Sequence, residues 1–348
     1  MKVIHIVHNY YGYSGATLQA KNLAKEINNN QKIHQVFFTR NNDALTNTEL
    51  QDDTLNVVAT SGGVKRAVDF AMLCFRFKPQ IAHFHGADFL LLIICKIFGI
   101  RTYWKSTLLG SDDFASLCGK GFRGFIKKKL LSLININNAL TQQMYDINRK
   151  FIRESRLVII PNGVELPDLE TCSVKDKSAL IVSALIPRKG IIEGIDFYKN
   201  NLEKLGYKLH VIGPNHAGLE GYDDAYANEC LRYSSGNIIF EGGLSHDQVK
   251  SFLARARFLI HLSKKEGMPN VVLEALAYGL VPIIDDMDGL SNELLKSEQM
   301  GYNVKNGIFH EDSYSLINVD ARDYIHHNIG FPIIAKKTLC IYNMLLKK

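Results

Sequence analysis

Residues 263–282 constrain the fold more than any other part of this chain. They read SKKEGMPNVVLEALAYGLVP, with the apolar segments FLIHL just before them and LVPII at their end. Both segments have the length and continuity of buried strands, so the pattern predicts a βαβ unit with parallel strands. Glu266 and Glu274 then stand at the carboxyl edge of the sheet, on a loop and on the helix that follows it. In open α/β sheets, ligands bind along this edge.

The length of the chain indicates two domains. One hydrophobic core rarely fills 348 residues, and a hydrophobic content of 46% is enough for two cores. Strand-like apolar runs alternate with helix-length segments, which is the pattern of doubly wound α/β domains. A polar stretch rich in turn formers, residues 161–178, interrupts this alternation and is expected to link the domains. The predicted strands are 3–7, 36–38, 81–84, 102–104 and 157–160 in the first half, and 180–182, 209–212, 238–240, 258–262 and 281–284 in the second.

Composition excludes several classes of protein. Six cysteines without a close pair indicate neither a zinc site nor a disulfide framework, and they favour a reducing cytoplasm. The apolar segment 89–100 is shorter than the ~20 residues of a membrane span, and Lys96 interrupts it, so we expect a helix buried on a sheet. A strand follows directly from Met1 without a signal-peptide pattern. The net charge of +6 is moderate, and no dense basic tract with interleaved aromatic residues indicates nucleic-acid binding.

Short motifs are spread over nearly the whole chain. Besides EGMPNVVLEALAYGLVPIIDD, with its Glu-x7-Glu pair, they are IHIVHNYYGYSGATLQAKNLA, PQIAHFHG, TLLGSDD, IIPNGVE, PRKG and HVIGP. Together they resemble the retaining GT-B glycosyltransferases of family four, also called glycosyl transferases group one. The resemblance implies an α/β protein of the GT-B class, in which two Rossmann-like doubly wound domains face a central cleft.

The resemblance also implies a role for each domain. Residues 1–165, joined by a C-terminal helix at about 331–348 that crosses back, would bind the acceptor. Residues 166–330 would bind a nucleotide-sugar donor. Transfer would retain the configuration of the anomeric carbon and, since the leaving phosphate can take the acceptor's proton, would require no side-chain base. We expect no cofactor and no metal, because Asp112-Asp113 and Asp285-Asp286 are adjacent pairs rather than a spaced chelate.

The predicted donor site lies in the second domain. A carboxylate accepts hydrogen bonds from vicinal hydroxyls, and by resemblance Glu266 would bind the donor sugar and Glu274 the ribose. Lys189 and Arg188 are catalytic candidates because fixed cations stabilise the departing diphosphate. A solvated turn remains the alternative for this pair, and a helix-surface position the alternative for Glu274. The other predicted donor-binding residues are Gly15, Gly213 and, at a helix N-terminus suited to phosphate, Gly267, Met268, Pro269, Asn270 and Val271.

The first domain offers fewer candidates. Gly12 and Gly15 follow the first strand, where small residues let the backbone approach a ligand. Their Gly-x-x-Gly spacing disfavours a dinucleotide site. His85 follows the strand at 81–84 and is a catalytic candidate that would position the reacting sugar, with a structural histidine as the alternative. Asp88, Asp112 and Asp113 are the candidate acceptor-binding residues.

Two positions depart from the family pattern. Ser183-Ala184 stand where the family usually has Gly-Arg, and Leu109 stands where many relatives carry a histidine before glycine. These departures leave two alternatives open besides a transferase. One is a non-catalytic nucleotide-sugar-binding protein, and the other is a nucleotide-sugar epimerase of the same fold.

The predicted function is transfer of a hexose or N-acetylhexosamine to a saccharide or lipid-linked acceptor. The donor is expected to be a UDP-linked sugar, and the setting to be the synthesis of bacterial surface polysaccharide or lipopolysaccharide in the cytoplasm. A basic amphipathic segment from Lys120 to Ile134 also predicts peripheral docking on the anionic inner face of the plasma membrane. A core helix with a solvated basic face is the alternative reading of that segment.

Overall fold

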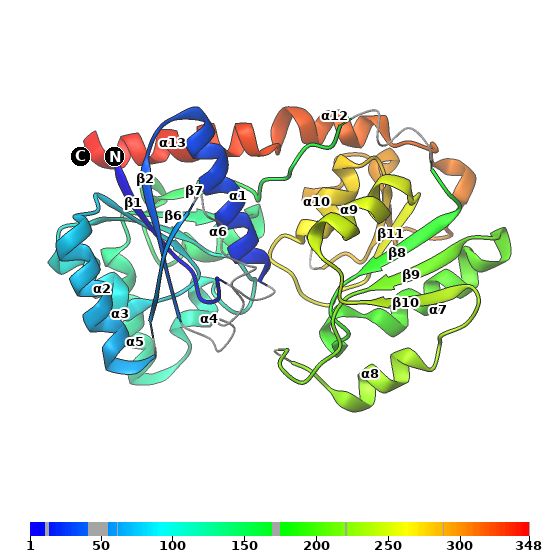
Figure 1. Ribbon diagram of the computed structural model, residues 1–348, viewed down its shortest axis with the longest axis horizontal. Helices are drawn as coiled ribbons and strands as arrows, with labels where there is room; N and C mark the ends of the chain where they lie inside the picture. Colours follow the sequence, from blue (N-terminus) through cyan, green and yellow to red (C-terminus); the bar gives the residue numbers. More distant parts are fainter. Residues whose placement is uncertain are drawn as a thin grey trace. The chain divides into compact units, whose positions relative to one another are not determined.

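The chain forms two compact units in the computed structural model (Figure 1). The structure describes residues 1–10, 14–40, 55–60, 62–168, 175–219, 221–287 and 289–347. Unit 1 comprises Met1–Gly163 together with Phe331–Lys348, and unit 2 comprises Val164–Gly330. Gly12 and part of the expected linker, residues 169–174, lie outside the described residues. In the described part of the chain, no helix is long and apolar enough to cross a membrane.

Unit 1 contains a parallel sheet of seven strands in the order β3-β2-β1-β4-β5-β6-β7. The order reverses between β1 and β4, as in doubly wound folds. The strands are β1 (Lys2–Ile6), β2 (His34–Arg40), β3 (Asn56–Thr60), β4 (Ile81–His85), β5 (Arg101–Lys105), β6 (Ile136–Ala139) and β7 (Leu157–Ile159). The helices are α1 (Gly15–Asn30), α2 (Gly63–Phe77), α3 (Phe89–Ile97), α4 (Phe114–Cys118), α5 (Gly121–Leu130), α6 (Gln142–Asn148) and α13 (Phe331–Lys347).

Unit 2 repeats this plan with six parallel strands in the order β10-β9-β8-β11-β12-β13. Here the order reverses between β8 and β11, which pair directly. The strands are β8 (Ser178–Val182), β9 (Lys208–Ile212), β10 (Ile238–Gly242), β11 (Phe258–His261), β12 (Val281–Ile284) and β13 (Tyr302–Asn303). The helices are α7 (Ile191–Asn201), α8 (Asp224–Leu231), α9 (His246–Arg255), α10 (Asn270–Ala277), α11 (Leu290–Leu294) and α12 (Val319–Asn328).

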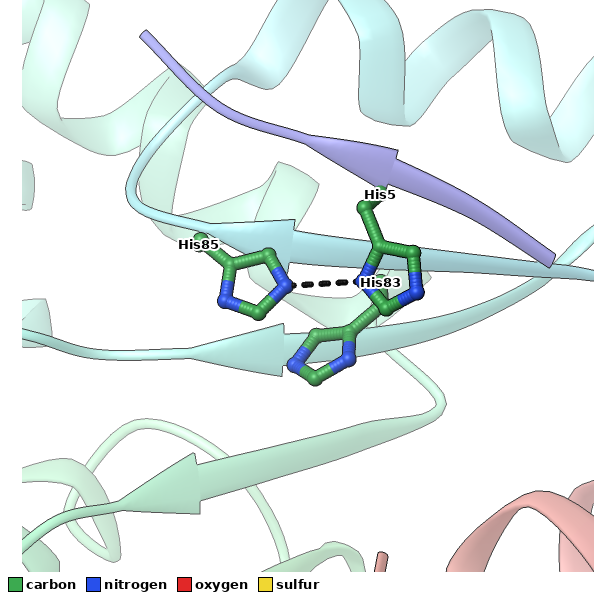
Figure 2. Close-up of side chains that lie close together, drawn as sticks. All are labelled: His5, His83 and His85. Atoms are coloured by element: carbon green, nitrogen blue, oxygen red, sulfur yellow. Dashed lines mark hydrogen bonds between the residues drawn. The ribbon is translucent and has the colours of Figure 1, made fainter. Parts of the chain in front are cut away.

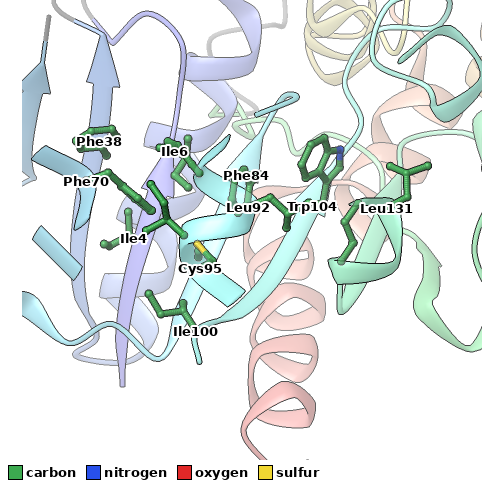
Figure 3. Close-up of a cluster of buried hydrophobic side chains, with 14 of the residues drawn as sticks. Ile4, Ile6, Phe38, Phe70, Phe84, Leu92, Cys95, Ile100, Trp104 and Leu131 are labelled. Carbon is green, nitrogen blue, oxygen red and sulfur yellow. The ribbon is translucent and has the colours of Figure 1, made fainter. Parts of the chain in front are cut away.

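Side chains alternate along the strands of unit 1, so the sheet has an apolar surface on each side and a layer of helices packs on each surface. Ile4, Ile6 and Phe84 point to one face, where they pack with Leu92 of α3 in the cluster shown in Figure 3. Val3, Ile81 and Tyr103 point to the other face, against α1 and α13. Because successive residues of a strand face opposite sides, a sheet covered on both sides requires continuous apolar strands. This requirement explains why strand-length apolar runs reveal the sheet in the sequence.

The fold class predicted from the sequence is confirmed, with two doubly wound parallel sheets. The apolar segment 89–100 forms the short helix α3, as expected. Sequence analysis missed three strands. β3 is only partly buried, β6 carries the buried amides of Asn137 and Asn138, and β13 has two residues. In β6 the amides bond backbone carbonyls, Asn137 to Trp104 at 3.0 Å and Asn138 to Ile160 at 3.0 Å, so polar residues fill a core strand.

Candidate functional site

The centre of the site in unit 2 is an ion pair at the carboxyl edge of the sheet. Lys189 Nζ lies 2.5 Å from Glu266 Oε1. Lys189 ends the short 3₁₀ turn Pro187–Lys189 after β8, and Glu266 lies on the loop after β11. Because β8 and β11 are neighbours at the point where the strand order reverses, these two loops emerge side by side. In doubly wound sheets this reversal point is where ligands bind.

A glycine allows the two loops to touch. Gly190 has a φ of +64°, and a Cβ at this position would lie 2.1 Å from the backbone oxygen of Leu262. The Lys264 backbone N–H also donates to the Arg188 carbonyl at 2.9 Å. Only a residue without a Cβ combines this close approach with a left-handed backbone at no steric cost. Gly190 therefore sets how near Lys189 comes to Glu266.

Glu266 is ionised although its side chain is only 9% exposed. Burial by itself raises the pKa of this carboxyl, but His261 and Lys189 outweigh burial and hold the pKa well below its usual range. His261 Nε2 lies 3.4 Å from Glu266 Oε1, and Arg188 Nη1 lies 3.7 Å from it. All of these contacts reach Oε1. Among the described residues none reaches Oε2, so this oxygen can accept hydrogen bonds from hydroxyl groups.

The two cations are held in different ways. Arg188 is 38% exposed, and its Nη1 donates to the Lys265 carbonyl at 2.6 Å. Lys189 is 19% exposed and gives one of its three N–H donors to Glu266. Both side chains therefore keep donors that could meet a diphosphate. The structure brings Lys189, Arg188 and Glu266 together, as the predicted donor site requires.

Glu274 lies on α10, the helix that follows the loop of Glu266, and it has a different partner. Its Oε1 lies 3.1 Å from Nε2 of His246, the first residue of α9. The hydrogen bond to Glu274 raises the pKa of His246, against the opposing effect of burial. Sequence analysis missed His246. No motif marks it, because the contact joins residues on two separate helices.

The remaining residues of the predicted donor set, apart from Gly15, lie in unit 2. Pro269 caps α10, followed by Asn270 and Val271, while Gly267 and Met268 are buried on the preceding loop. Gly213 follows β9, and a Cβ there would lie 1.9 Å from the Ser183 carbonyl. Gly213 thus serves a close contact between two chain segments. Gly15 is the first residue of α1, in unit 1.

The site in unit 1 contains three buried histidines on neighbouring strands. His5 comes from β1 and His83 and His85 from β4, with His5 and His83 in register. Figure 2 shows the hydrogen bond between His5 and His85, with His83 beside them. Burial lowers the pKa of His5 to about 4 and the pKa values of His83 and His85 well below the usual range. All three rings are therefore neutral at pH 7.

A chain of hydrogen bonds selects the tautomer of His85. Gln35 Nε2 donates to the Ala24 carbonyl at 2.8 Å, so Gln35 Oε1 accepts from His5 Nε2 at 2.8 Å. The other nitrogen of a neutral ring is an acceptor, so His5 Nδ1 accepts from His85 Nε2 at 3.0 Å. His85 Nδ1 is then left with a free lone pair, and it has no hydrogen-bond partner among the described residues. This nitrogen can accept a hydroxyl proton or hydrogen bond.

The same histidines are a group that could hold a metal ion. One nitrogen from each of His5, His83 and His85 lies within 4.8 Å of the others. Two of these rings already share a hydrogen bond, which an ion would have to replace. The positive charge of buried Lys105 also acts on His83 and His85, and burial lowers the pKa of Lys105 to about 8. The absence of a metal requirement stays a prediction.

The three candidate acceptor carboxylates all have local structural partners. Asp88 caps α3 by accepting from Leu91 N at 3.1 Å and forms a buried ion pair with Arg66. Asp112 accepts from the backbone and hydroxyl of Thr107 at 2.7 to 2.8 Å. Asp113 caps α4 and accepts from Ser116 N at 2.9 Å. Their contacts explain their positions in the fold, and an acceptor role for them stays a prediction.

Comparison with known proteins finds a family model that matches unit 2. Residues 170–317, most of unit 2, match the family model described as glycosyl transferases group 1. Unit 2 therefore contains the domain that this family model describes. The match contains Lys189, Glu266 and Glu274, whose contacts define the unit 2 site.

The curated relatives that the chain matches are distant. The gpi3 subunit of phosphatidylinositol N-acetylglucosaminyltransferase from Schizosaccharomyces pombe is 22% identical over 75% of this chain and 57% of its own length. GDP-mannose:cellobiosyl-diphosphopolyprenol alpha-mannosyltransferase from Xanthomonas campestris is 23% identical over 82% of this chain and 79% of its own. The chain thus spans little more than half of the yeast relative.

Solved structures confirm the GT-B class of the fold. Anabaena HepE, crystallised with UDP and glucose, superposes with a TM-score of 0.79 at 14% identity and covers 99% of this chain and 100% of its own. The lipopolysaccharide outer core galactosyltransferase WaaB superposes with a TM-score of 0.63 at 17% identity, covering 99% of both chains. At these identities the likeness concerns the fold.

Replacing Gly190 with alanine tests how the loops are held. We expect Gly190→Ala to destabilise unit 2 by about 2 to 4 kcal/mol, because strain at positive φ adds to overlap with the Leu262 carbonyl. Gly206 is the matched control, since its φ is +80° but a Cβ there meets nothing within 4 Å. Gly206→Ala should cost only about 1 to 2 kcal/mol. Denaturant unfolding of both variants measures the difference, and equal losses would show that the loops are not in close contact.

The contact between His246 and Glu274 predicts a pH dependence of stability. Because folding raises the pKa of His246, its contribution is fully present below about pH 6.5 and is lost as the pH rises through the raised value. His246→Gln should therefore lower the free energy of unfolding more at acidic than at alkaline pH. Unfolding curves across this range measure the effect. In a Glu274→Gln background the pH dependence of the His246→Gln effect should largely disappear, and its persistence would assign it to another group.

Proposed function

We propose that this protein is a retaining, metal-independent glycosyltransferase that moves a sugar from a nucleoside diphosphate to an acceptor. The observation that carries this proposal is the meeting of a buried carboxylate and two cations, Glu266 with Lys189 and Arg188, at the strand reversal of unit 2. A nucleotide sugar presents both halves of this pattern, hydroxyl groups on its sugar and ribose and negative charge on its diphosphate. Hydroxyl acceptors and phosphate-binding donors in one cluster match both halves.

Each residue of the unit 2 site has a role in this proposal. Glu266 accepts hydrogen bonds from hydroxyls of the donor sugar through Oε2, while its Oε1 positions Lys189. Lys189 and Arg188 stabilise the negative charge that grows on the departing diphosphate, which lowers the barrier more than it tightens ground-state binding. The N-terminus of α10, at Asn270, faces phosphate with its dipole. Glu274 binds the ribose.

Unit 1 is the proposed acceptor-binding half. Its candidate catalytic group is His85, whose unprotonated Nδ1 could accept a hydrogen bond from a sugar hydroxyl. The acceptor we favour is lipid-linked. The names of two relatives support this choice, since one acts on phosphatidylinositol and the other on a cellobiosyl-diphosphopolyprenol. We place the reaction in the synthesis of bacterial surface polysaccharide or lipopolysaccharide.

The donor we favour is a UDP-linked hexose or N-acetylhexosamine. HepE binds UDP and glucose, and the yeast relative is named for N-acetylglucosamine transfer. The Xanthomonas campestris relative instead uses GDP-mannose, so the base needs a direct test. Ser183 and Ala184, directly after β8, stand where members of the family that the sequence resembles usually carry glycine and arginine. The phosphate contacts of this chain therefore depend more heavily on Lys189 and Arg188.

Thermal shift with nucleotide sugars tests the donor class. A ligand at about 100 times its dissociation constant adds about 2.7 kcal/mol to the stability of the protein it binds. We expect UDP sugars to raise the melting temperature more than matched GDP sugars at equal concentration. The variant Glu274→Ala should reduce this shift. Stabilisation by neither class of nucleotide sugar would reject donor binding altogether.

Variants of the two charged groups test the chemistry. Lys189→Ala should lower kcat by roughly 10² to 10³, because it removes a cation from the transition state. Glu274→Ala should weaken donor binding by about 1.5 to 3 kcal/mol. Lys264→Ala is the matched control, since Lys264 lies on the same loop as Glu266 but pairs with Glu193 at 2.9 Å. Steady-state kinetics and calorimetry measure these effects.

The assignments of Lys189 and Glu274 fail if both variants stay within threefold of wild type. The same assays separate the alternative functions. Binding of a nucleotide sugar without turnover on any acceptor would indicate a sugar-nucleotide sensor. Release of an isomerised nucleotide sugar without an acceptor would indicate an epimerase.

A further inference from the structure

Three helices of unit 1 share an exposed apolar surface, here called the three-helix face. α2, α3 and α5 cover the same side of the sheet, with α3 packed against both of the others (Figure 1). Eleven of the eighteen exposed large hydrophobic side chains among the described residues lie on these helices or on Phe98, the residue that caps α3. The most exposed of them are Val64 and Phe75 on α2, Ile97 on α3, and Phe122 and Phe125 on α5.

The apolar side chains of α5 serve no core. Phe122 is 77% exposed and Phe125 55%, and the only buried residue of this helix within the described structure is Gly124. A Cβ at Gly124 would lie 2.1 Å from the Cys118 carbonyl, so α5 packs on the unit through its backbone. The alternative that the sequence left open, a core helix with a solvated basic face, is therefore wrong for Phe122 and Phe125, whereas Leu131 and Ile134 at the end of the same segment are buried in the core. Phe122 and Phe125 are available for an external contact.

Positive charge surrounds the apolar side chains. Residues 63–78, 89–98 and 120–130 carry eight exposed lysines and arginines, and none of the eight pairs with a carboxylate among the described residues. The same segments contain one acidic residue, Asp69, which accepts a hydrogen bond from the Thr60 hydroxyl at 2.5 Å. Lys129 lies over the Phe125 ring, 4.6 Å from its centre. Cations and apolar groups thus occupy the same surface.

A pocket on this side of the unit shows the same combination. It has a volume of about 240 Å³ and lies beside the C-terminal ends of α2 and α3. Cys74, Phe75, Phe98 and Ile100 give it apolar walls, and Lys78 lines it as well. Apolar groups beside a cation match the boundary between the acyl chains and the anionic headgroups of a membrane.

We propose that the three-helix face docks unit 1 on an anionic lipid bilayer. Protein interfaces place few lysines at their cores, whereas an anionic bilayer attracts cations and accepts apolar side chains at the same time. Each lysine or arginine held near such a surface strengthens partitioning by about fivefold. The proposal goes beyond the transfer reaction, because neither Lys189 nor Glu266 takes part in it. A lipid-linked acceptor would then be reached from its own membrane.

Vesicle flotation of the full-length chain tests the docking surface. We expect strong recovery with vesicles that contain phosphatidylserine, at least tenfold weaker partitioning to pure phosphatidylcholine, and release by high salt. Phe122→Ser/Phe125→Ser and Lys128→Glu/Lys129→Glu should each weaken binding about tenfold or more. Phe75→Ser on α2 and Ile97→Ser on α3 should also weaken it. Circular dichroism and thermal melting establish that each variant is folded.

Matched controls lie in unit 2 and on α13. Ile308→Ser alters a side chain that is 79% exposed, and Lys336→Glu/Lys337→Glu reverses two exposed cations, so neither should change flotation.

Equal recovery from neutral and anionic vesicles would overturn the proposal, as would control variants that weaken binding equally. If only the α5 variants weaken vesicle binding, the claim that α2 and α3 share in the docking surface is wrong. Loss of a dimer in light scattering, without a change in flotation, would assign the surface to a second copy of the chain. Flotation without any sugar transfer would support docking while rejecting the proposed enzyme.

Discussion

The unit 2 site depends on the reversal of strand order between β8 and β11. Two parallel strands that are far apart in the chain become neighbours there, and their loops leave the sheet side by side. One loop brings a lysine and an arginine, and the other brings a glutamate that the fold buries. A buried carboxylate is unfavourable without a partner, so Glu266 stays ionised because Lys189 and His261 lie beside it. Gly190 permits the close contact of the two loops. The same geometry that stabilises the charge also concentrates donors and acceptors suited to a nucleotide sugar.

Unit 1 uses its own reversal point differently. Where β1 meets β4, three histidine rings are buried together and burial disfavours their protonated forms, so the rings are neutral and hydrogen bonding decides their chemistry. The amide of Gln35 orients His5, and His5 orients His85. The outcome is a fixed lone pair on His85 Nδ1 rather than a mobile charge. Unit 2 thus offers paired charges, and unit 1 offers a neutral hydrogen-bond acceptor.

The two helix layers of unit 1 also differ in their surroundings. α13 is an amphipathic helix whose buried side, with Tyr342 bonded to His83 at 2.7 Å, packs toward the histidine face of the sheet. The opposite layer, formed by α2, α3 and α5, buries the apolar cluster of Figure 3 yet keeps large apolar side chains outside. The need for a packed core explains why the inner side chains of that layer are apolar. It does not explain the exposed apolar side chains, which contact with a lipid surface would explain.

The sequence by itself determined the fold class and most strands, and it predicted that Lys189, Arg188 and Glu266 meet at one site, which the structure shows. Buried parallel strands must be continuous apolar runs, and the acids and cations that follow them mark the carboxyl edge. It missed β6, whose buried asparagines satisfy their own hydrogen bonds, and it did not reveal His5, Gln35 or His246. Only the tertiary structure showed that Asp88 and Asp113 cap helices and that Glu274 meets His246. Those contacts join residues distant in the chain or depend on the orientation of a side chain. Periodicity records which face a residue occupies, whereas the partner it meets there depends on strand order and packing.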